Sequence, residues 1–368
     1  MHLRSDTFEQ RLRDLGAEWV ELESGRVVSS FDDPDAGYWA VREGDVGLAD
    51  RSERQTLAVA GEDAVEWLQG LVTNDLVDLV ELGSGQWNFA TDVNGRIVSD
   101  MRVLHLPDLL LLDLEPGTIE SGLVDHLRQN IILEDVELDV RTGRTGRIGL
   151  YGASASDVID AEATLEESAG ALAPFDGTWG RLGGVGIVVR REPMTGEPGY
   201  ELYFERSKSA EVWGRLEGSS AARIEPIGQR TVETLRIEAG TPRFGVELDD
   251  EIIPLEAGLR PFISFDKGCY VGQEIIARLD ARGEPAKRLR TLVFEGGAAP
   301  GEGAEVRADD REVGEVRSSV WSPALRAPVA LAYVGRRHHD FGTTVRVEGR
   351  EATVRPLGHP LDQGRTER

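Results

Sequence analysis

The octet KGCYVGQE at residues 267–274 is the stretch of this 368-residue chain best suited to chemistry. Cys269 is the single cysteine, and Lys267, two residues before it, is one of only three lysines among 41 lysines and arginines. A nearby ammonium stabilises a thiolate, the reactive form of cysteine. A lone cysteine is usually a small buried apolar residue. Because this segment is too rich in glycine for a helix core, we interpret Cys269 as functional and Lys267 as part of its site.

Several other kinds of chemistry lack the residues they need. One cysteine excludes an internal disulfide and any all-cysteine zinc or iron–sulfur site within one chain. The sequence contains no phosphate-binding loop, no dinucleotide-binding glycine motif and no Gly-x-Ser-x-Gly nucleophile elbow. The six histidines include no pair spaced four apart, and the adjacent His338 and His339 rarely suit one metal ion. We therefore expect no metal site.

Charge and hydropathy argue against a nucleic-acid-binding or membrane protein. The chain has 66 acidic and 41 basic residues, a net charge of −25, and 40% hydrophobic residues, enough for packed cores. Because the chain is this acidic, we do not expect it to bind nucleic acid or an anionic membrane surface. The start has no apolar signal segment, and the longest apolar run, residues 103–114, is too short to span a bilayer. We expect a soluble cytoplasmic protein, adapted to high salt or simply acidic.

Hydropathy patterns predict the elements that position these residues. Helical spacing of apolar residues predicts helices at 6–15, 61–70, 156–165 and 209–216. Runs of β-favouring residues predict strands at 56–60, 87–90, 97–106, 109–114, 147–151, 185–190 and 201–204. Asn94-Gly95 predicts a hairpin turn, because both residues tolerate positive φ. From about residue 286 onward only short strands between Gly and Pro are predicted, which is typical of a small β-barrel or sandwich, with a polar tail from about 362. The expected fold class is α+β.

Six motifs, in order along nearly the whole chain, resemble the GcvT/YgfZ superfamily. They are TNDL at 73–76, NGRIVSD at 94–100, TGEPGYE at 195–201, LRIEAG at 235–240, KGCYVGQE at 267–274 and PVALAYV at 328–334. The KGCYVGQE octet is the most specific of them. It resembles the signature of the YgfZ-type folate-binding proteins, which are relatives of the glycine-cleavage T-protein.

This resemblance implies a three-domain arrangement around a central funnel that holds tetrahydrofolate. The implied division is a folate-binding module at 1–285, with α+β sub-domains near 1–145 and 146–285, and a C-terminal β-barrel at 286–368.

The resemblance also implies roles for individual residues. Asp100 matches the second aspartate of the T-protein's Gly-Gly-x-x-Asp-Asp run and would be catalytic, facing the one-carbon nitrogens of the folate. Glu201 matches the glutamate that binds the pterin, where a carboxylate accepts hydrogen bonds from the 2-amino and ring N–H groups. Arg236 matches a folate-binding arginine. Asp100 could equally be a solvent-facing carboxylate at a strand end.

Two departures from the T-protein pattern favour the YgfZ branch. Val232 stands where the T-protein has a second folate-binding arginine, and Cys269 is gained. The retained Asp100 favours the T-protein branch. Our main hypothesis is a tetrahydrofolate-binding accessory factor in iron–sulfur protein assembly or repair, with iron–sulfur client proteins as partners.

Two alternatives stay open. The first is a GcvT-like aminomethyltransferase that passes a one-carbon unit from a lipoyl carrier protein to tetrahydrofolate. The second is a non-catalytic scaffold that binds a partner.

Glutamates at 238, 256 and 274 are interpreted as ion-pair partners of the arginines at 236, 260 and 278.

Overall fold

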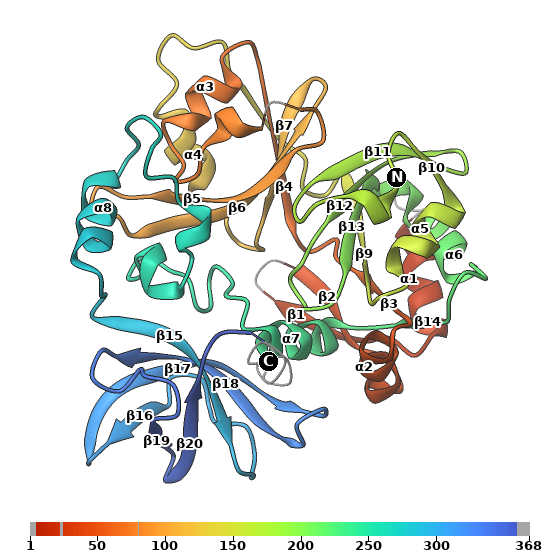
Figure 1. Ribbon diagram of the computed structural model, residues 1–368. Coiled ribbons are helices and arrows are strands. Elements are labelled where there is room, and N and C mark those ends of the chain that lie inside the picture. Colours follow the sequence, from red (N-terminus) through yellow and green to blue (C-terminus); the bar gives the residue numbers. More distant parts are fainter. Residues whose placement is uncertain (1–4, 23–24, 80, 359–368) are drawn as a thin grey trace. The chain divides into compact units, whose positions relative to one another are not determined.

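The computed structural model describes residues 5–22, 25–79 and 81–358, and it shows a mixed α+β fold, as expected (Figure 1). The chain divides into two compact units. Unit 1 comprises residues 1–68, 76–87 and 101–232, and unit 2 comprises residues 69–75, 88–100 and 233–368. Within the described residues, no helix has the length and apolar character needed to cross a membrane. The finer division at residues 145 and 285 remains a prediction.

The larger sheet of unit 1 has seven strands in the order β10-β11-β12-β13-β9-β3-β14, antiparallel except where β14 runs parallel to β3. These strands are β3 (Val46–Asp50), β9 (Thr145–Tyr151), β10 (Ala163–Leu165), β11 (Gly177–Leu182), β12 (Val185–Arg191), β13 (Gly199–Glu205) and β14 (Ile224–Pro226). Apolar side chains of α1 (Ser5–Asp14), α5 (Ala155–Glu162) and α6 (Ser209–Glu217) join the apolar residues of this sheet in one buried cluster. Burial of this cluster supplies the main driving force for folding of the unit.

A second sheet has the strand order β5-β6-β7-β4-β8, and its strands β5 and β6 include residues of both units. Its strands are β4 (Gln55–Ala60), β5 (Gly85–Thr91), β6 (Ile97–Leu106), β7 (Leu109–Leu114) and β8 (Glu137–Val140). The predicted bounds of the β6 and β7 strands are confirmed, and so is the turn at Asn94-Gly95. Gly95 has φ of +73°, and the Asp92 carboxylate accepts hydrogen bonds from the backbone N–H groups of Asn94 and Arg96. The remaining short elements of unit 1 are β1 (Glu18–Leu22), β2 (Gly25–Ser30), α2 (Pro34–Glu43), α3 (Ala64–Gln69) and α4 (Leu123–Arg128).

Unit 2 contains the predicted C-terminal barrel, a closed ring of six strands in the order β15-β18-β17-β16-β19-β20. The strands, drawn in blue in Figure 1, are β15 (Lys287–Phe294), β16 (Glu305–Ala308), β17 (Arg311–Ser322), β18 (Ala327–Gly335), β19 (Thr344–Val347) and β20 (Arg350–Arg355). Alternate side chains of these strands fill the interior with valine, leucine and alanine, and with Phe294. The expected tail from residue 362 lies outside the described residues.

Several elements were predicted with wrong bounds or not at all. The helix expected at 156–165 ends at Glu162, and its last three residues form β10, which pairs with β11. The strand β17 was not predicted, because charged residues occupy much of its alternating pattern. The helices α7 (Gln229–Ala239) and α8 (Gln273–Arg282) were not predicted either; α8 begins directly after the glycine-rich part of the octet.

Candidate functional site

The KGCYVGQE loop of unit 2 is held at its first residue by Lys267. The ammonium donates to the backbone carbonyl oxygens of Gln69 at 2.6 Å, Val72 at 2.7 Å and Asn74 at 2.8 Å. Burial lowers the pKa of Lys267 to about 8, while the Asp75 carboxylate acts in the opposite direction. Lys267 therefore links the octet to the TNDL motif, almost 200 residues away in sequence.

The other end of the loop is held where α8 begins. The Thr91 hydroxyl donates to the carbonyl oxygen of Val271 at 2.6 Å. Gly272 has φ of +83°, and a Cβ there would lie 2.4 Å from the carbonyl oxygen of Asp92 and 2.8 Å from the Cα of Gly95. Only glycine fits this close approach without strain. The octet is thus also fixed to the NGRIVSD turn.

Cys269 lies between these two fixed points and is exposed. The Lys267 ammonium donates its hydrogen bonds to carbonyl oxygens and, at 3.4 Å, to the Gln69 side chain. Tyr270, the next residue, is buried and packs in an apolar cluster with Ile263 and Ile276. The structure therefore presents an accessible thiol on a loop whose backbone is anchored on both sides.

The other two predicted site residues of unit 2 are buried. Asp100 lies in β6 with none of its surface exposed, so it is not the solvent-facing carboxylate that the sequence also allowed. Arg236, on α7, is fully buried and pairs with Glu233 at 2.9 Å and Glu247 at 3.0 Å. It also donates to the carbonyl oxygen of Thr241 at 2.6 Å. Burial favours the neutral form, but the two carboxylates outweigh it and raise the pKa of Arg236.

These contacts correct two of the predicted ion pairs. Arg236 pairs with Glu233 and Glu247 rather than with Glu238. Arg260 pairs with Asp280 at 2.8 Å. The Glu256 carboxylate instead accepts a hydrogen bond from the backbone N–H of Ile253, which caps the short 3-10 helix that follows.

Glu201, the predicted pterin ligand, lies in unit 1 on β13, next to β9. It is 2% exposed, and the hydroxyl of Tyr151 donates to its Oε1 at 2.5 Å. Among the residues that the structure describes, none donates a hydrogen bond to its Oε2. Nε of Arg147 lies 4.0 Å from this Oε2. Glu201 therefore has one satisfied oxygen and one open acceptor.

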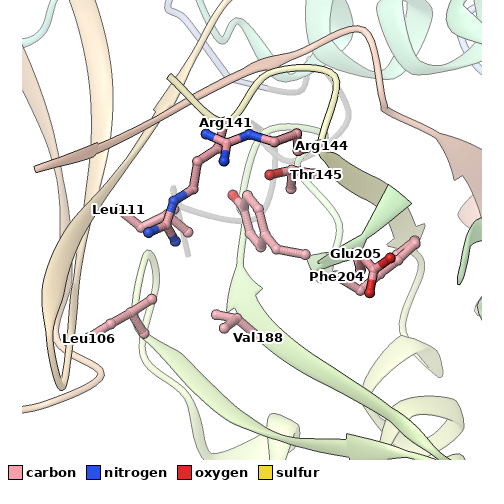
Figure 2. A pocket seen from close by; sticks show the side chains of 9 residues that line it. Leu106, Leu111, Arg141, Arg144, Thr145, Val188, Phe204 and Glu205 are labelled. Atoms are coloured by element: carbon pink, nitrogen blue, oxygen red, sulfur yellow. The ribbon is translucent and has the colours of Figure 1, made fainter. Parts of the chain in front are cut away.

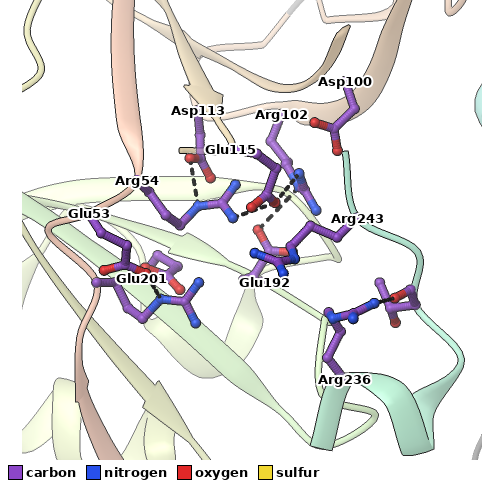
Figure 3. A network of polar contacts seen from close by, with 12 residues as sticks. Glu53, Arg54, Asp100, Arg102, Asp113, Glu115, Glu192, Glu201, Arg236 and Arg243 are labelled. Atoms are coloured by element: carbon purple, nitrogen blue, oxygen red, sulfur yellow. Dashed lines mark hydrogen bonds and ion pairs between the residues drawn. The ribbon is translucent and has the colours of Figure 1, made fainter. Parts of the chain in front are cut away.

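Sequence reasoning missed the buried ion network around Glu201 (Figure 3). Among the described residues, ion pairs connect four arginines and four carboxylates of unit 1, with side chains no more than 4% exposed: Arg54, Arg102, Arg147, Arg190, Asp113, Glu115, Glu192 and Glu201. A separate ion pair, Arg51–Glu53, interacts electrostatically with Glu201 and Arg54. A buried network of this kind is stable only while its charges remain paired.

Asp113 is the centre of this network. Its carboxylate accepts from Arg54 at 3.0 Å, Arg147 at 2.6 Å and Arg190 at 2.5 Å. Burial alone would raise the pKa of Asp113, but these guanidinium groups outweigh it and hold the pKa well below its usual range. The sequence carried one signal of this role, since Asp113 interrupts the apolar run of β7.

Unit 1 also contains two cavities, and none of the predicted site residues lines either. The smaller, about 270 Å³, has an apolar wall that includes Leu106, Leu111 and Val188, with Arg141 and Arg144 at its edge (Figure 2). The larger, about 610 Å³, lies beside β1 and β2, and Glu53 is among its lining residues. Across the described part of the chain, no group of three His, Cys, Asp or Glu side chains is arranged to hold a metal ion.

Comparison with known proteins covers nearly the whole chain. The GCVT N-terminal domain family matches residues 8–267, and the glycine cleavage T-protein C-terminal barrel domain matches residues 287–361. An aminomethyltransferase of Caldanaerobacter subterraneus subsp. tengcongensis is 30% identical over 333 residues, 90% of this chain and 88% of that relative. An aminomethyltransferase of Symbiobacterium thermophilum is 30% identical over 370 residues, 97% and 96% of the two chains.

A solved structure shows the same fold. The crystal structure of glycine cleavage system aminomethyltransferase T from Bartonella henselae superposes with a TM-score of 0.84 at 20% identity, over 95% of each chain. The expected relation to the T-protein superfamily is confirmed, whereas the narrower assignment to the YgfZ branch is not shown. Both family domains are present, in order and with the expected barrel, and the chain belongs to the glycine cleavage T-protein family.

Proposed function

We propose that this chain binds tetrahydrofolate and transfers an aminomethyl-derived one-carbon unit to it from a lipoyl carrier protein. Relatives named aminomethyltransferases match it over 88% and 96% of their own length, and this similarity carries the proposal. This similarity favours the aminomethyltransferase alternative over our main hypothesis from the sequence, the accessory factor in iron–sulfur protein assembly.

The Oε2 atom of Glu201 can accept a hydrogen bond from the pterin end of a folate. The buried Oε2 is an acceptor without a donor among the described residues, and a pterin presents two N–H donors on one edge, the 2-amino group and the ring N–H. A buried acceptor left unsatisfied costs about 1 to 3 kcal/mol, so a ligand that supplies donors would recover that free energy. All three guanidinium nitrogens of Arg236 already donate hydrogen bonds within unit 2. A direct contact between Arg236 and the folate stays a prediction from the resemblance.

The proposed reaction needs a base and a stabilised cation near the folate nitrogens. The aminomethyl carbon exchanges its bonds to the carrier sulfur and to its amine nitrogen for bonds to two folate nitrogens. The two folate N–H protons leave with the thiol and with ammonia, so atoms and charge balance. Asp100, a fully buried carboxylate, would stabilise positive charge on the folate nitrogen and accept its proton.

One experiment separates these roles. Purified chain is tested for tetrahydrofolate binding and for formation of 5,10-methylenetetrahydrofolate from an aminomethyl-lipoyl carrier. Glu201→Gln should weaken binding at least tenfold, and Asp100→Asn should lower the rate of transfer at least a hundredfold with little change in binding. Glu205→Gln, at the exposed end of the same strand, is the matched control. A chain that does not bind tetrahydrofolate would contradict the proposal and favour the scaffold alternative.

A second candidate function rests on Cys269. An exposed thiol on an anchored loop favours the YgfZ-type accessory role in iron–sulfur protein assembly or repair. That role predicts folate binding without aminomethyl transfer, and loss of iron–sulfur enzyme activity in cells carrying Cys269→Ser. If Cys269→Ser cells keep normal iron–sulfur enzymes while the purified chain transfers the aminomethyl group, this second function is wrong.

A further inference from the structure

Tyr151 lies on β9, beside the strand that carries Glu201. In the antiparallel register, Tyr151 is opposite Gly199 and Glu201 is opposite Gly149, so the two side chains are diagonal neighbours. The Tyr151 hydroxyl donates to Oε1 of Glu201 at 2.5 Å, and Tyr151 is 0% exposed. The tyrosine thus reaches across the strand pair to a single carboxylate oxygen.

Two glycines make room for this reach. A Cβ on Gly149 would lie 2.5 Å from the Tyr151 hydroxyl and 2.7 Å from two carbons of its ring. A Cβ on Gly199 would lie 2.9 Å from another carbon of the same ring. Neither glycine has a positive φ, so their role here is space rather than backbone conformation. The ring is therefore fixed by close packing on both strands.

The hydrogen bond has only one possible direction under ordinary conditions. Burial raises the pKa of Tyr151 well above 10, with Glu201 adding to the effect and Arg51 opposing it, so the phenol remains a donor. Oε1 is then occupied by a donor, while Oε2 is left as an acceptor with no hydrogen bond from the described residues. A ligand that meets Oε2 must itself bring an N–H or O–H group.

We propose that Tyr151 is the positioning residue of the pterin site. By holding Oε1, it orients the Glu201 carboxylate so that Oε2 selects pteridines with a 2-amino donor over those without one. Tyr151 acts through Glu201 and does not itself touch the ligand. This inference rests on the proposed function, because it assumes that Glu201 binds the pterin.

The test compares two ligands and two tyrosine variants. Binding of tetrahydrofolate and of 2-desaminotetrahydrofolate is measured for the wild type, Tyr151→Phe and Tyr203→Phe. The wild type should prefer the 2-amino compound at least tenfold, since a hydrogen bond to a charged group contributes about that factor. Tyr151→Phe should lose most of this preference by weakening only the 2-amino compound. Tyr203→Phe should keep the preference; Tyr203 lies on β13, with its hydroxyl 3.4 Å from Asp113.

A second comparison uses one variant that displaces the Tyr151 ring without removing its hydroxyl, together with a control variant. Gly149→Ala should reduce the ligand preference as Tyr151→Phe does, whereas Gly186→Ala, on β12 with nothing within 4 Å of the added carbon, should not. Each variant's thermal unfolding is recorded beside its binding.

The possible failures are distinguishable. Equal weakening of both ligands in Tyr151→Phe would mean a merely structural role and would overturn the inference, as would an unchanged preference. A wild type that binds tetrahydrofolate without any preference for the 2-amino group contradicts the inference alone. A wild type that binds neither ligand contradicts the proposed function, and the inference with it.

Discussion

The two units fix their candidate functional groups by opposite means. In unit 1, Glu201 belongs to a buried network in which four arginines pair with four carboxylates. In unit 2, the loop that carries Cys269 is held by contacts to uncharged groups: the Lys267 ammonium donates to backbone carbonyl oxygens, the Thr91 hydroxyl donates to Val271, and Gly272 closely approaches the backbone of Asp92. Removing one charge from the network leaves its buried partners without a counter-charge. The anchors of the loop are separate contacts, so each can be removed without changing the others.

The largest expected effect comes from removing the central charge of unit 1. Asp113→Asn keeps the shape of the side chain but leaves three buried guanidinium groups without their shared carboxylate. Breaking a buried pair in this way costs about 3 to 5 kcal/mol. Urea unfolding should show this loss, whereas Asp139→Asn, which pairs with Arg141 and Arg144 at the surface, should change little. A loss no greater than that of Asp139→Asn would contradict the proposed dependence on one charge.

Acid should remove the same contribution without a mutation. The folded-state pKa of Asp113 lies well below its unfolded value of about 3.9, so its ion pairs stabilise the fold fully above that pH. As the pH falls below about 4 toward the folded pKa, protonation removes this stabilisation. The stability gap between the wild type and Asp113→Asn should therefore be constant from pH 7 to 5 and narrow at pH 3. A gap that does not change at pH 3 would mean that Asp113 is not the titrating group.

A smaller effect is expected when the anchor in unit 2 is removed. Lys267→Met leaves three backbone carbonyl oxygens without their donor, at a cost of about 1 to 3 kcal/mol. Thermal unfolding measures the loss, and the rate of Cys269 alkylation reports on the loop. Lys208→Met, whose ammonium pairs with Glu211 at the surface, is the control. Stability equal to that of the control would show that the Lys267 bonds do not hold the loop.

The smallest change is expected from salt. Raising KCl from 0.1 to 2 M should stabilise the wild type, because the net charge of −25 is screened within a few ångströms. Buried pairs are screened much less, so the deficit of Asp113→Asn should stay the same within about 0.5 kcal/mol. If the stability difference between the wild type and Asp113→Asn shrinks with salt, the network is exposed to solvent rather than buried. No stabilisation of the wild type would contradict adaptation to high salt.

The sequence predicted elements best where local signals were strong. The strands β6 and β7 have the predicted bounds because two apolar runs are separated by Pro107-Asp108 and preceded by Asn94-Gly95. The end of α5 was misplaced because pairing of residues 163–165 with β11 overrides their helical pattern.

The site was predictable only as separate motifs. TNDL, NGRIVSD and KGCYVGQE could each be recognised, but their meeting through Lys267 and Thr91 depends on contacts between residues about 180 to 200 positions apart. The network of unit 1 was missed for the same reason, since Arg54 and Asp113 are 59 residues apart. Burial of Asp113 in an apolar strand was the one local signal.

Glu247 connects helix α7 to the barrel, and this connection matters for protein engineering. It binds Arg236 from α7, accepts a hydrogen bond from the hydroxyl of Ser318 on β17, and offers its backbone carbonyl to the Tyr333 hydroxyl of β18 at 2.9 Å. A shortened chain that lacks the barrel would lose both hydroxyl donors at this junction. Chimeras that exchange barrels between relatives must therefore transfer compatible hydroxyls at these two positions, because the barrel completes the surroundings of a buried arginine in the preceding helix.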